Sequence, residues 1–236
     1  MAVVIAVQLT FYSEKYHLLP AHQFGGRPGQ TTMDAVHLVI CKIKTAWWQG
    51  NIMLILFLDV KGIFLNAVPA RLIHNLHKRR IPSRHANFIS GMLEGRTTFL
   101  RFDNHISSTI KLDNGIGQGD PLSMVLYQFY NADILDIPFC KNKVLIAYVN
   151  NALILAMGKD FYKIYDMLVD MMTREGSIYN WTLTHNSPIE HSKLALIDFA
   201  HPRKDVTRPD LKLPSITISP IESTRYLEII LDQHLN

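Results

Sequence analysis

Residues 144–158 have the sequence VLIAYVNNALILAMG. Two runs of apolar, strand-forming residues flank the pair Asn150 and Asn151. Asparagine tolerates the left-handed backbone conformation that a two-residue hairpin turn needs. The stretch therefore predicts an apolar β-hairpin with the two asparagines at its tip.

A second apolar segment, residues 52–60 (IMLILFLDV), is continuous rather than alternating and predicts a strand buried on both faces. Asp59 lies at its end. Burying an unpaired carboxylate is costly, so such a group is kept where it binds a cation or a strong donor. The alternative is an aspartate that faces solvent or caps a turn at Gly62.

Residues 113–127 (DNGIGQGDPLSMVLY) combine a glycine-rich loop with the start of a helix at Pro121. Glycines at positions 115, 117 and 119 would let the backbone approach a ligand closely, and a helix N-terminus favours anions. The spacing matches neither a dinucleotide fingerprint nor a P-loop. A simple turn before a helix explains the same residues.

The remaining pattern predicts further helices and strands. A helix is expected to start near Asp34, with Thr32 as its cap, and to end at Gly50. Other helices are expected over residues 66–81, 83–94, 121–136 and 159–175, and strands over 97–102, 107–113, 193–199 and 225–232. This order predicts an α+β domain with a largely antiparallel sheet and helices on one face.

Composition limits the class of protein. The chain has 236 residues, of which 48% are hydrophobic and 19% charged, so it can form a core as one compact unit. The net charge of +4 permits a polyanionic partner without requiring one. Cys41 and Cys140 lie in apolar segments and are expected to be buried thiols.

Targeting signals are not apparent. The N-terminus lacks the basic region and cleavage site of a signal peptide, and no apolar run approaches the roughly 18 residues that span a bilayer. The sequence predicts an intracellular protein of the nucleus or cytoplasm, without a membrane partner.

Six segments, in this order, resemble successive motifs of reverse transcriptases, the RNA-directed DNA polymerases. The resemblance is to the non-LTR (LINE-type) retrotransposon branch, and the sequences of these segments are especially similar to copies in fungal genomes. The segments are QFGGRPGQTTMDAVH (23–37), LFLDVKGIFLNAV (56–68), LDNGIGQGDPLSMVLY (112–127), AYVNNALILA (147–156), HSKLALIDF (191–199) and RYLEIILD (225–232).

The resemblance implies a polymerase palm, in which helices back an antiparallel sheet. Residues 51–236 would form the palm and residues 1–50 part of the fingers. The family's other finger segments and its thumb do not fit in this chain, which is therefore expected to be a truncated copy with the thumb absent.

The resemblance also implies an activity, RNA-templated DNA synthesis, in which two Mg²⁺ ions clamp the attacking and leaving oxygens. RNA template, DNA primer and dNTP would be the partners. By resemblance Asp59 is a catalytic metal ligand, and Phe64 screens the sugar 2′ position. Gln118 and Gly119 line the template and nucleotide pocket, and Lys193 lies near the triphosphate. Alternatively, Phe64 belongs to the core, Gln118 to a turn and Lys193 to a solvated strand.

The hairpin tip departs from the family pattern. The family has Tyr/Phe-x-Asp-Asp there, and this chain has Tyr148-Val149-Asn150-Asn151. The two asparagines thus occupy degenerate catalytic positions, and one carboxylate remains where the family has three. Two divalent ions beside a triphosphate need that anionic frame. Mg²⁺ binding is therefore expected to be impaired and this copy to be catalytically dead.

Three further departures from the family pattern agree with the loss of function by mutation. Lys61 stands at an expected acidic position, Leu65 at a proline and Glu228 at the glycine of a turn. Each change, like Asp to Asn, can arise from one transition mutation. We interpret the chain as a degenerate element copy.

Two alternatives remain open. Residues 74–85 (HNLHKRRIPSRH) concentrate basic side chains and would suit a non-catalytic nucleic-acid-binding remnant, although cations also suit a helix C-terminus. The other alternative is a pseudogene product without function.

Overall fold

The computed structural model of the chain describes residues 1–137, 142–200 and 208–236. Its helices are α1 (Ala2–Lys15), α2 (Thr32–Trp48), α3 (Pro69–Lys78), α4 (Ser83–Leu93), α5 (Pro121–Leu135), α6 (Phe161–Thr173) and α7 (Ile178–Thr184), with a 3-10 turn at His191–Lys193. Its strands are β1 (Gln23–Phe24), β2 (Ile52–Asp59), β3 (Thr97–Thr98), β4 (Arg101–Phe102), β5 (His105–Ile106), β6 (Ile110–Lys111), β7 (Lys143–Tyr148), β8 (Asn151–Gly158), β9 (Ala195–Phe199), β10 (Leu211–Leu213), β11 (Ile216–Ile218), β12 (Ser223–Tyr226) and β13 (Ile229–Asp232).

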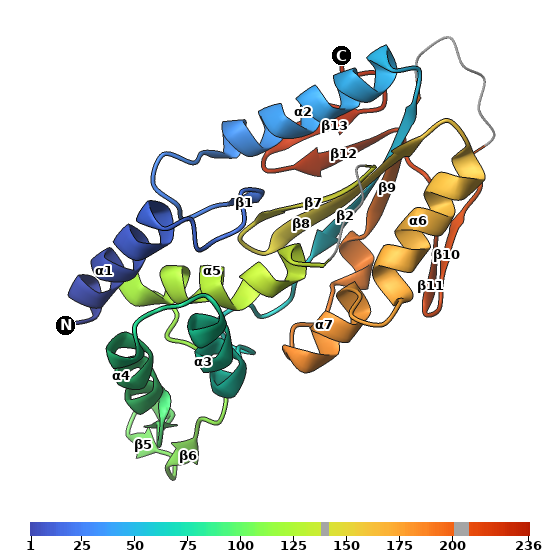
Figure 1. Cartoon of the computed structure of the whole chain (residues 1–236). Helices are drawn as coiled ribbons and strands as arrows, with labels where there is room; N and C mark the ends of the chain where they lie inside the picture. The colour runs from blue at the N-terminus through green and yellow to red at the C-terminus, as the bar shows by residue number, and fades with distance from the viewer. Residues whose placement is uncertain (138–141, 201–207) are drawn as a thin grey trace.

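Five strands form the central sheet in the order β1–β7–β8–β2–β9 (Figure 1). Strand β1 runs parallel to β7, and the other neighbouring pairs are antiparallel. The predicted α+β fold with a largely antiparallel sheet is confirmed. The pairing of β2 with β8 brings Asp59 opposite Asn151, so the apolar segments 52–60 and 144–158 meet in one ladder.

Helices cover both faces of this sheet, which corrects the expectation of helices on one face. Successive side chains of a strand point to opposite faces. In β2, Met53, Ile55 and Phe57 therefore pack with the core beneath α2, whereas Leu54 and Leu56 pack with the core beneath α6. The continuous apolar run of β2 follows from this burial on both sides.

A third core surrounds α5, which packs against α1 and α3 beside the sheet, and α4 packs against α3 (Figure 1). The predicted start at Pro121 is confirmed. The side chain of Asp120 caps the helix by accepting a hydrogen bond from the Leu122 amide at 2.8 Å.

The N-terminus of α2 differs from the prediction by one residue. Thr31, not Thr32, is the cap: its side chain accepts from the Asp34 amide, and the Asp34 carboxylate accepts from the Thr31 amide at 2.7 Å. This reciprocal pair needs the three-residue spacing that Thr31 has and Thr32 lacks. The helix ends before Gly50, as predicted.

The expectation of buried thiols is wrong for Cys41, which is exposed. The apolar residues of α2 that reach the core include Val39 and Ile43, and Cys41 lies midway between them on the opposite face of the helix. Cys140 lies outside the described residues.

The C-terminal segment 225–232, expected as one strand, is the hairpin β12–β13. Leu227 and Glu228 form its turn, with φ angles of +48° and +68°. Left-handed backbone of this kind favours glycine. At Glu228, where the family resemblance predicts glycine, the backbone conformation therefore also favours glycine.

We expect Glu228→Gly to stabilise the protein by about 1 kcal/mol, because glycine removes the steric cost of a left-handed non-glycine residue. Urea unfolding measures the change. As a control, Glu222→Gly in the neighbouring bend, whose φ is not positive, should lower stability instead. Equal effects of the two substitutions would contradict the explanation.

His185 makes stability depend on pH. Its ring stacks on Trp181 at 4.8 Å between centroids, and burial lowers its pKa from 6.5 to about 4. Because the unfolded chain then binds a proton that the folded chain does not, stability is complete above pH 6.5 and falls as pH drops toward 4. His185→Phe should remove about 2 kcal/mol of the stability loss between pH 7 and pH 5. Urea unfolding at both pH values checks this, and an unchanged pH slope in the variant would contradict it.

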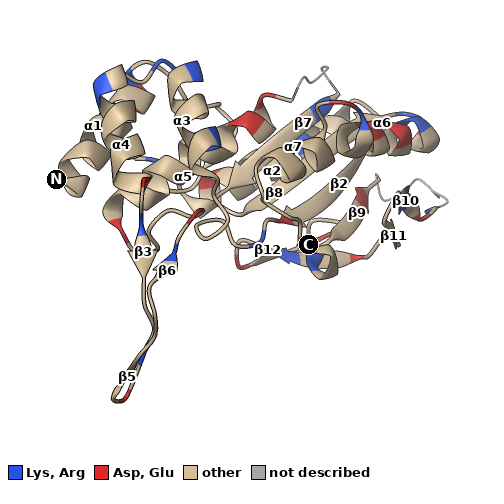
Figure 2. Ribbon diagram, turned by 90° about the horizontal axis from the view of Figure 1, so that it is seen from below, with Lys and Arg blue, Asp and Glu red and all other residues tan. Residues whose placement is uncertain are grey.

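Residues 97–112 form a projecting arm made of two short ladders, β3 with β6 and β4 with β5 (Figure 2). The prediction of paired strands over 97–102 and 107–113 is confirmed in outline. Within the described ranges, no helix combines the length and apolarity that crossing a bilayer requires.

Candidate active site

The tip of the β7–β8 hairpin has Val149 and Asn150 as its two loop residues, because Asn151 already pairs with Tyr148 in the ladder. The expectation that both asparagines form the turn is thus wrong by one residue. The left-handed φ of +53° falls on Val149, a β-branched residue for which this conformation is strained. Asn151 instead begins β8 and lies beside Asp59.

Several contacts hold this strained tip in place. Asn131 of α5 donates a hydrogen bond to the Val149 carbonyl at 3.2 Å, and the Val60 amide donates to the Asn150 carbonyl at 3.0 Å. Gly25 packs so closely that a Cβ on it would lie 2.7 Å from Val149 Cγ2. The position of the tip therefore depends on α5, β2 and the loop after β1 together.

Asp59 is a buried carboxylate whose two oxygens both have partners. Asn150 Nδ2 donates to Oδ1 at 2.6 Å, and the Lys193 ammonium forms an ion pair with Oδ2. Asn151 Nδ2 in turn donates to Asn150 Oδ1 at 3.2 Å. Both asparagines thus lie in one hydrogen-bonded chain that ends on Asp59.

Two lysines compensate the carboxylates of this region. The hydrogen bond that Lys193 donates to Asp59, together with the negative charge of Asp59, raises the pKa of Lys193. Lys61 forms an ion pair with Glu190 at 2.7 Å, and the hydrogen bond from Lys61 is the main cause of the lowered pKa of Glu190. Asp59 and Glu190 are therefore balanced by Lys61 and Lys193, so this group carries no net charge.

Two pockets meet at the Asp59–Lys193 pair. One, of about 490 Å³, has Phe64, Gln118 and Asn150 in its lining together with that pair. The other, of about 430 Å³, lies on the side of the sheet that faces β12.

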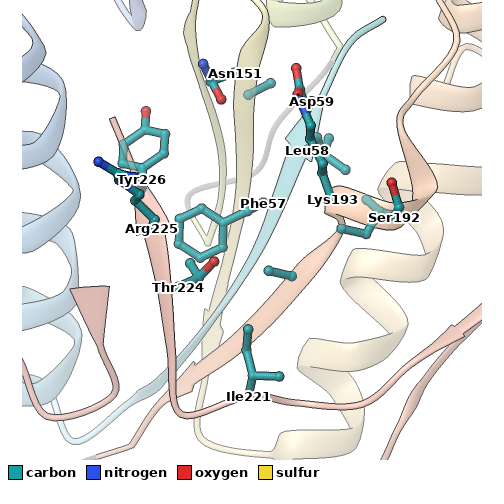
Figure 3. Close-up of a pocket in the computed structure, with 13 residues that line it drawn as sticks. Phe57, Leu58, Asp59, Asn151, Ser192, Lys193, Ile221, Thr224, Arg225 and Tyr226 are labelled. Atoms are coloured by element: carbon teal, nitrogen blue, oxygen red, sulfur yellow. The ribbon is translucent and has the colours of Figure 1, made fainter. Parts of the chain in front are cut away.

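Figure 3 shows the second pocket, with Asp59, Asn151 and Lys193 toward one end and Arg225 and Tyr226 across from Lys193. Every predicted site residue except Gly119 lines one of the two pockets. Gly119 follows Gln118 in an exposed loop, with a φ of +83° and open space around it. The roles assigned to these residues remain predictions.

Phe64 combines the two interpretations that the sequence left open. It is half-buried and lines the pocket, and its ring packs edge-on against Tyr127 at 5.8 Å. Tyr127 is buried within the α5 core, and this burial raises its pKa. The core thus positions one face of Phe64.

Sequence reasoning missed the pairing of Lys61 with Glu190 and the contribution of β12 to the second pocket. Both join segments that are far apart in the chain, and neither pairing leaves a periodic or spacing signal. Only the opposite charges of Lys61 and Glu190 hinted at a contact.

The residues present do not fit a site for two Mg²⁺ ions. Mg²⁺ prefers hard, anionic oxygen ligands, and each asparagine offers one neutral carbonyl oxygen. Asp59 supplies the one carboxylate at the three predicted metal-ligand positions, and an ammonium group already pairs with it. Glu190 in the same pocket pairs with Lys61. In the three described ranges, no cluster of three or more His, Cys, Asp or Glu residues could hold a metal ion.

The basic segment 74–85 is partly neutralised by acidic residues of α5 and its C-cap. Lys78 pairs with Asp133 at 2.8 Å, and Arg79 pairs with Asp136 at 2.6 Å. Arg79 also donates to the Leu18 carbonyl, and its side chain is largely buried. These two cations stabilise the packing of α3 on α5, which weakens the case for a phosphate-binding surface here.

Comparisons with known proteins identify the family and the fold of the chain. The reverse transcriptase (RNA-dependent DNA polymerase) family matches residues 2–187. A probable RNA-directed DNA polymerase from transposon X-element of Drosophila melanogaster is 26% identical over 98% of this chain and 25% of its own length. The RNA-directed DNA polymerase from mobile element jockey of Drosophila funebris is 24% identical over 92% of this chain and 24% of its own. The chain thus spans about a quarter of these relatives' length.

Solved telomerase structures show the same fold. The apo telomerase of Candida tropicalis aligns with 99% of this chain and 39% of its own, at a TM-score of 0.61 and 8% identity. Telomerase from Candida albicans, in complex with a TWJ fragment of telomeric RNA, aligns with 93% of this chain and 37% of its own, at a TM-score of 0.58 and 13% identity. The polymerase palm fold predicted from the motifs is confirmed.

The two relatives above come from Drosophila, so the particular resemblance to fungal copies remains a prediction, as does the boundary between fingers and palm at residue 50. The matched family and the transposon relatives confirm the predicted branch. The chain belongs to the reverse transcriptase (RNA-dependent DNA polymerase) family, as a domain of the non-LTR, LINE-type group.

Proposed function

We propose that this chain is a reverse transcriptase palm that does not add nucleotides. One observation carries the proposal: both oxygens of Asp59, the single carboxylate at the catalytic position, are occupied by Asn150 and by the Lys193 ammonium. The site is already compensated by the protein's own cation, so little negative charge remains to attract divalent ions.

The family reaction needs far more negative charge than this site holds. Two divalent ions about 3.5–4 Å apart repel each other, and carboxylates between them offset that repulsion. Here amide dipoles replace two of those carboxylates. When bound, Mg²⁺ would supply the charge that stabilises the transferring phosphoryl group. Without bound Mg²⁺, Asn150 and Asn151 only orient Asp59 and stabilise the end of the hairpin.

The pocket that we assign to the nucleotide is open beside the hairpin tip. Phe64, Gln118 and Lys193 line it together with Asp59. We therefore propose RNA template, DNA primer and dNTP as the partners of this fold. The chain would bind them without adding a nucleotide. The neutralised basic segment at Lys78 and Arg79 gives no separate support to a remnant that binds nucleic acid through that surface.

A titration with Mn²⁺, followed by the electron paramagnetic resonance signal of the free ion, tests the proposal. The unsubstituted chain should show no saturable binding below about 1 mM. Tighter saturable binding that disappears in Asp59→Asn would overturn the proposal, because that carboxylate would then be holding a metal ion.

A further inference from the structure

The arm (residues 97–112) exposes six large apolar side chains. Its exposed apolar side chains, with their exposed fractions, are Phe99 (57%), Leu100 (49%), Phe102 (65%), Ile106 (56%), Ile110 (41%) and Leu112 (38%). An isolated two-stranded hairpin is only marginally stable. Phe102 lies opposite His105 and Ile106 lies opposite Arg101 in the ladder, so apolar side chains are exposed on both faces of the arm. Exposed apolar side chains gathered in this way indicate an interaction surface.

A groove of complementary character lies at the base of the same arm. This base groove, of about 600 Å³, is formed by α3, α4 and the end of the arm, with Ala70, Ile73, Leu93 and Leu112 as its apolar residues. The tip of the arm, at β5, extends away from α3 and α4 (Figure 2), so the tip does not reach the groove of its own chain.

One pair of charges at the tip and the groove is complementary. Arg101 lies near the tip, two residues before Asp103, and Glu94 lies at the rim of the base groove. Neither side chain takes part in an ion pair with any residue that the structure describes, whereas the neighbouring Lys111 pairs with Asp113 at 2.8 Å. Because Lys111 is already paired, the arm offers few free cations. Binding the phosphate backbone of a nucleic acid would need several.

We propose that two copies of this chain form a dimer through their arms. The arms lie antiparallel, and each places its tip, with Phe102 and Ile106, in the base groove of the other. One two-fold axis satisfies both contacts with the same surface on each copy, as in most homodimers. Arg101 of each copy then meets Glu94 of the other.

The arms supply a large part of the surface that such a dimer needs. A whole aromatic side chain buries about 150–250 Å². Phe99 and Phe102 are 57% and 65% exposed, so each can contribute about 100–150 Å², and the four aliphatic side chains add to this. A standard interface buries roughly 800 Å² per partner.

Sedimentation equilibrium of the full chain over a range of concentrations tests the dimer. Wild type should be dimeric, and Phe102→Ser should weaken the dimer about thirtyfold, as expected for a central aromatic. Phe11→Ser is the matched control, because Phe11 is similarly exposed (56%) on α1. It should leave the dimer unchanged. A monomeric wild type, or equal effects of both substitutions, would overturn the proposal.

The charge pair supplies a second test that does not depend on apolar surface. Arg101→Glu and Glu94→Arg should each weaken the dimer, and the double variant should restore it because the pair is rebuilt with reversed polarity. Failure of the double variant to recover would contradict the tip-to-groove geometry. If wild type is monomeric and Phe102→Ser instead lowers binding of single-stranded RNA, the arm is a nucleic-acid surface and the dimer is excluded.

Discussion

The Asn150→Asp/Asn151→Asp variant is expected to bind Mn²⁺ about a hundredfold more tightly than the unsubstituted chain. Unit charges 4 Å apart interact by about 4 kcal/mol even at an effective dielectric constant of 20, and about 1.4 kcal/mol is a factor of ten. Two added carboxylates beside Asp59 should therefore have at least this effect. Paramagnetic resonance titration of the two chains measures it.

The added carboxylates should also destabilise the metal-free protein. Asn150 Nδ2 now lies 2.6 Å from Asp59 Oδ1, and an aspartate there would bring two carboxylate groups together. Mn²⁺ should consequently raise the melting temperature of the double variant and leave that of wild type unchanged.

The control for this prediction is Asn51→Asp/Asn142→Asp, which adds the same two charges outside the site. A third variant combines the two site substitutions with Lys193→Gln, which removes the competing ammonium, and it should bind Mn²⁺ more tightly still. If the site variant binds no more tightly than the control, Asn150 and Asn151 do not occupy metal-ligand positions.

Gly25→Ala should destabilise the protein by about 3 kcal/mol and displace the hairpin tip. Gly25 has a φ of +73°, so a side chain costs about 1–2 kcal/mol in backbone strain. Its Cβ would also lie 2.7 Å from Val149 Cγ2 and 3.1 Å from the Val149 amide nitrogen, and overpacking of this kind adds about 1–3 kcal/mol. Urea unfolding measures the total.

Gly29→Ala separates the two terms. Gly29 has almost the same φ, +72°, but nothing lies within 4 Å of its added Cβ. It should therefore cost only the backbone term, about 1–2 kcal/mol. Equal losses in the two variants would mean that Gly25 does not hold the tip through close packing.

Local pattern was sufficient to predict the elements that carry the site. The unbroken apolar run before Asp59 required a strand buried on both faces, and the apolar runs around Asn150 required a hairpin. Pro121 after the glycine-rich loop marked the start of α5. Each of these depends on neighbours within a few residues, which is where sequence periodicity carries information.

Contacts between distant segments could not be predicted in the same way. The ion pair of Lys193 with Asp59 depends on β9 lying beside β2, and that of Lys61 with Glu190 on the neighbouring bridge between Val60 and Ile189. The two-residue strand β1 and the short hairpin β10–β11 are too brief to leave a period. The left-handed φ fell on Val149 because the ladder register, rather than residue preference, determines which residues form the loop.

Primer extension on an RNA template, with Mg²⁺ and with Mn²⁺, tests the central claim most directly. Because Asp59 is already paired with Lys193 and no other carboxylate lies at the hairpin tip, the unsubstituted chain should add no nucleotide under either condition. Template-dependent extension by the unsubstituted chain that is lost in Asp59→Asn would contradict the account.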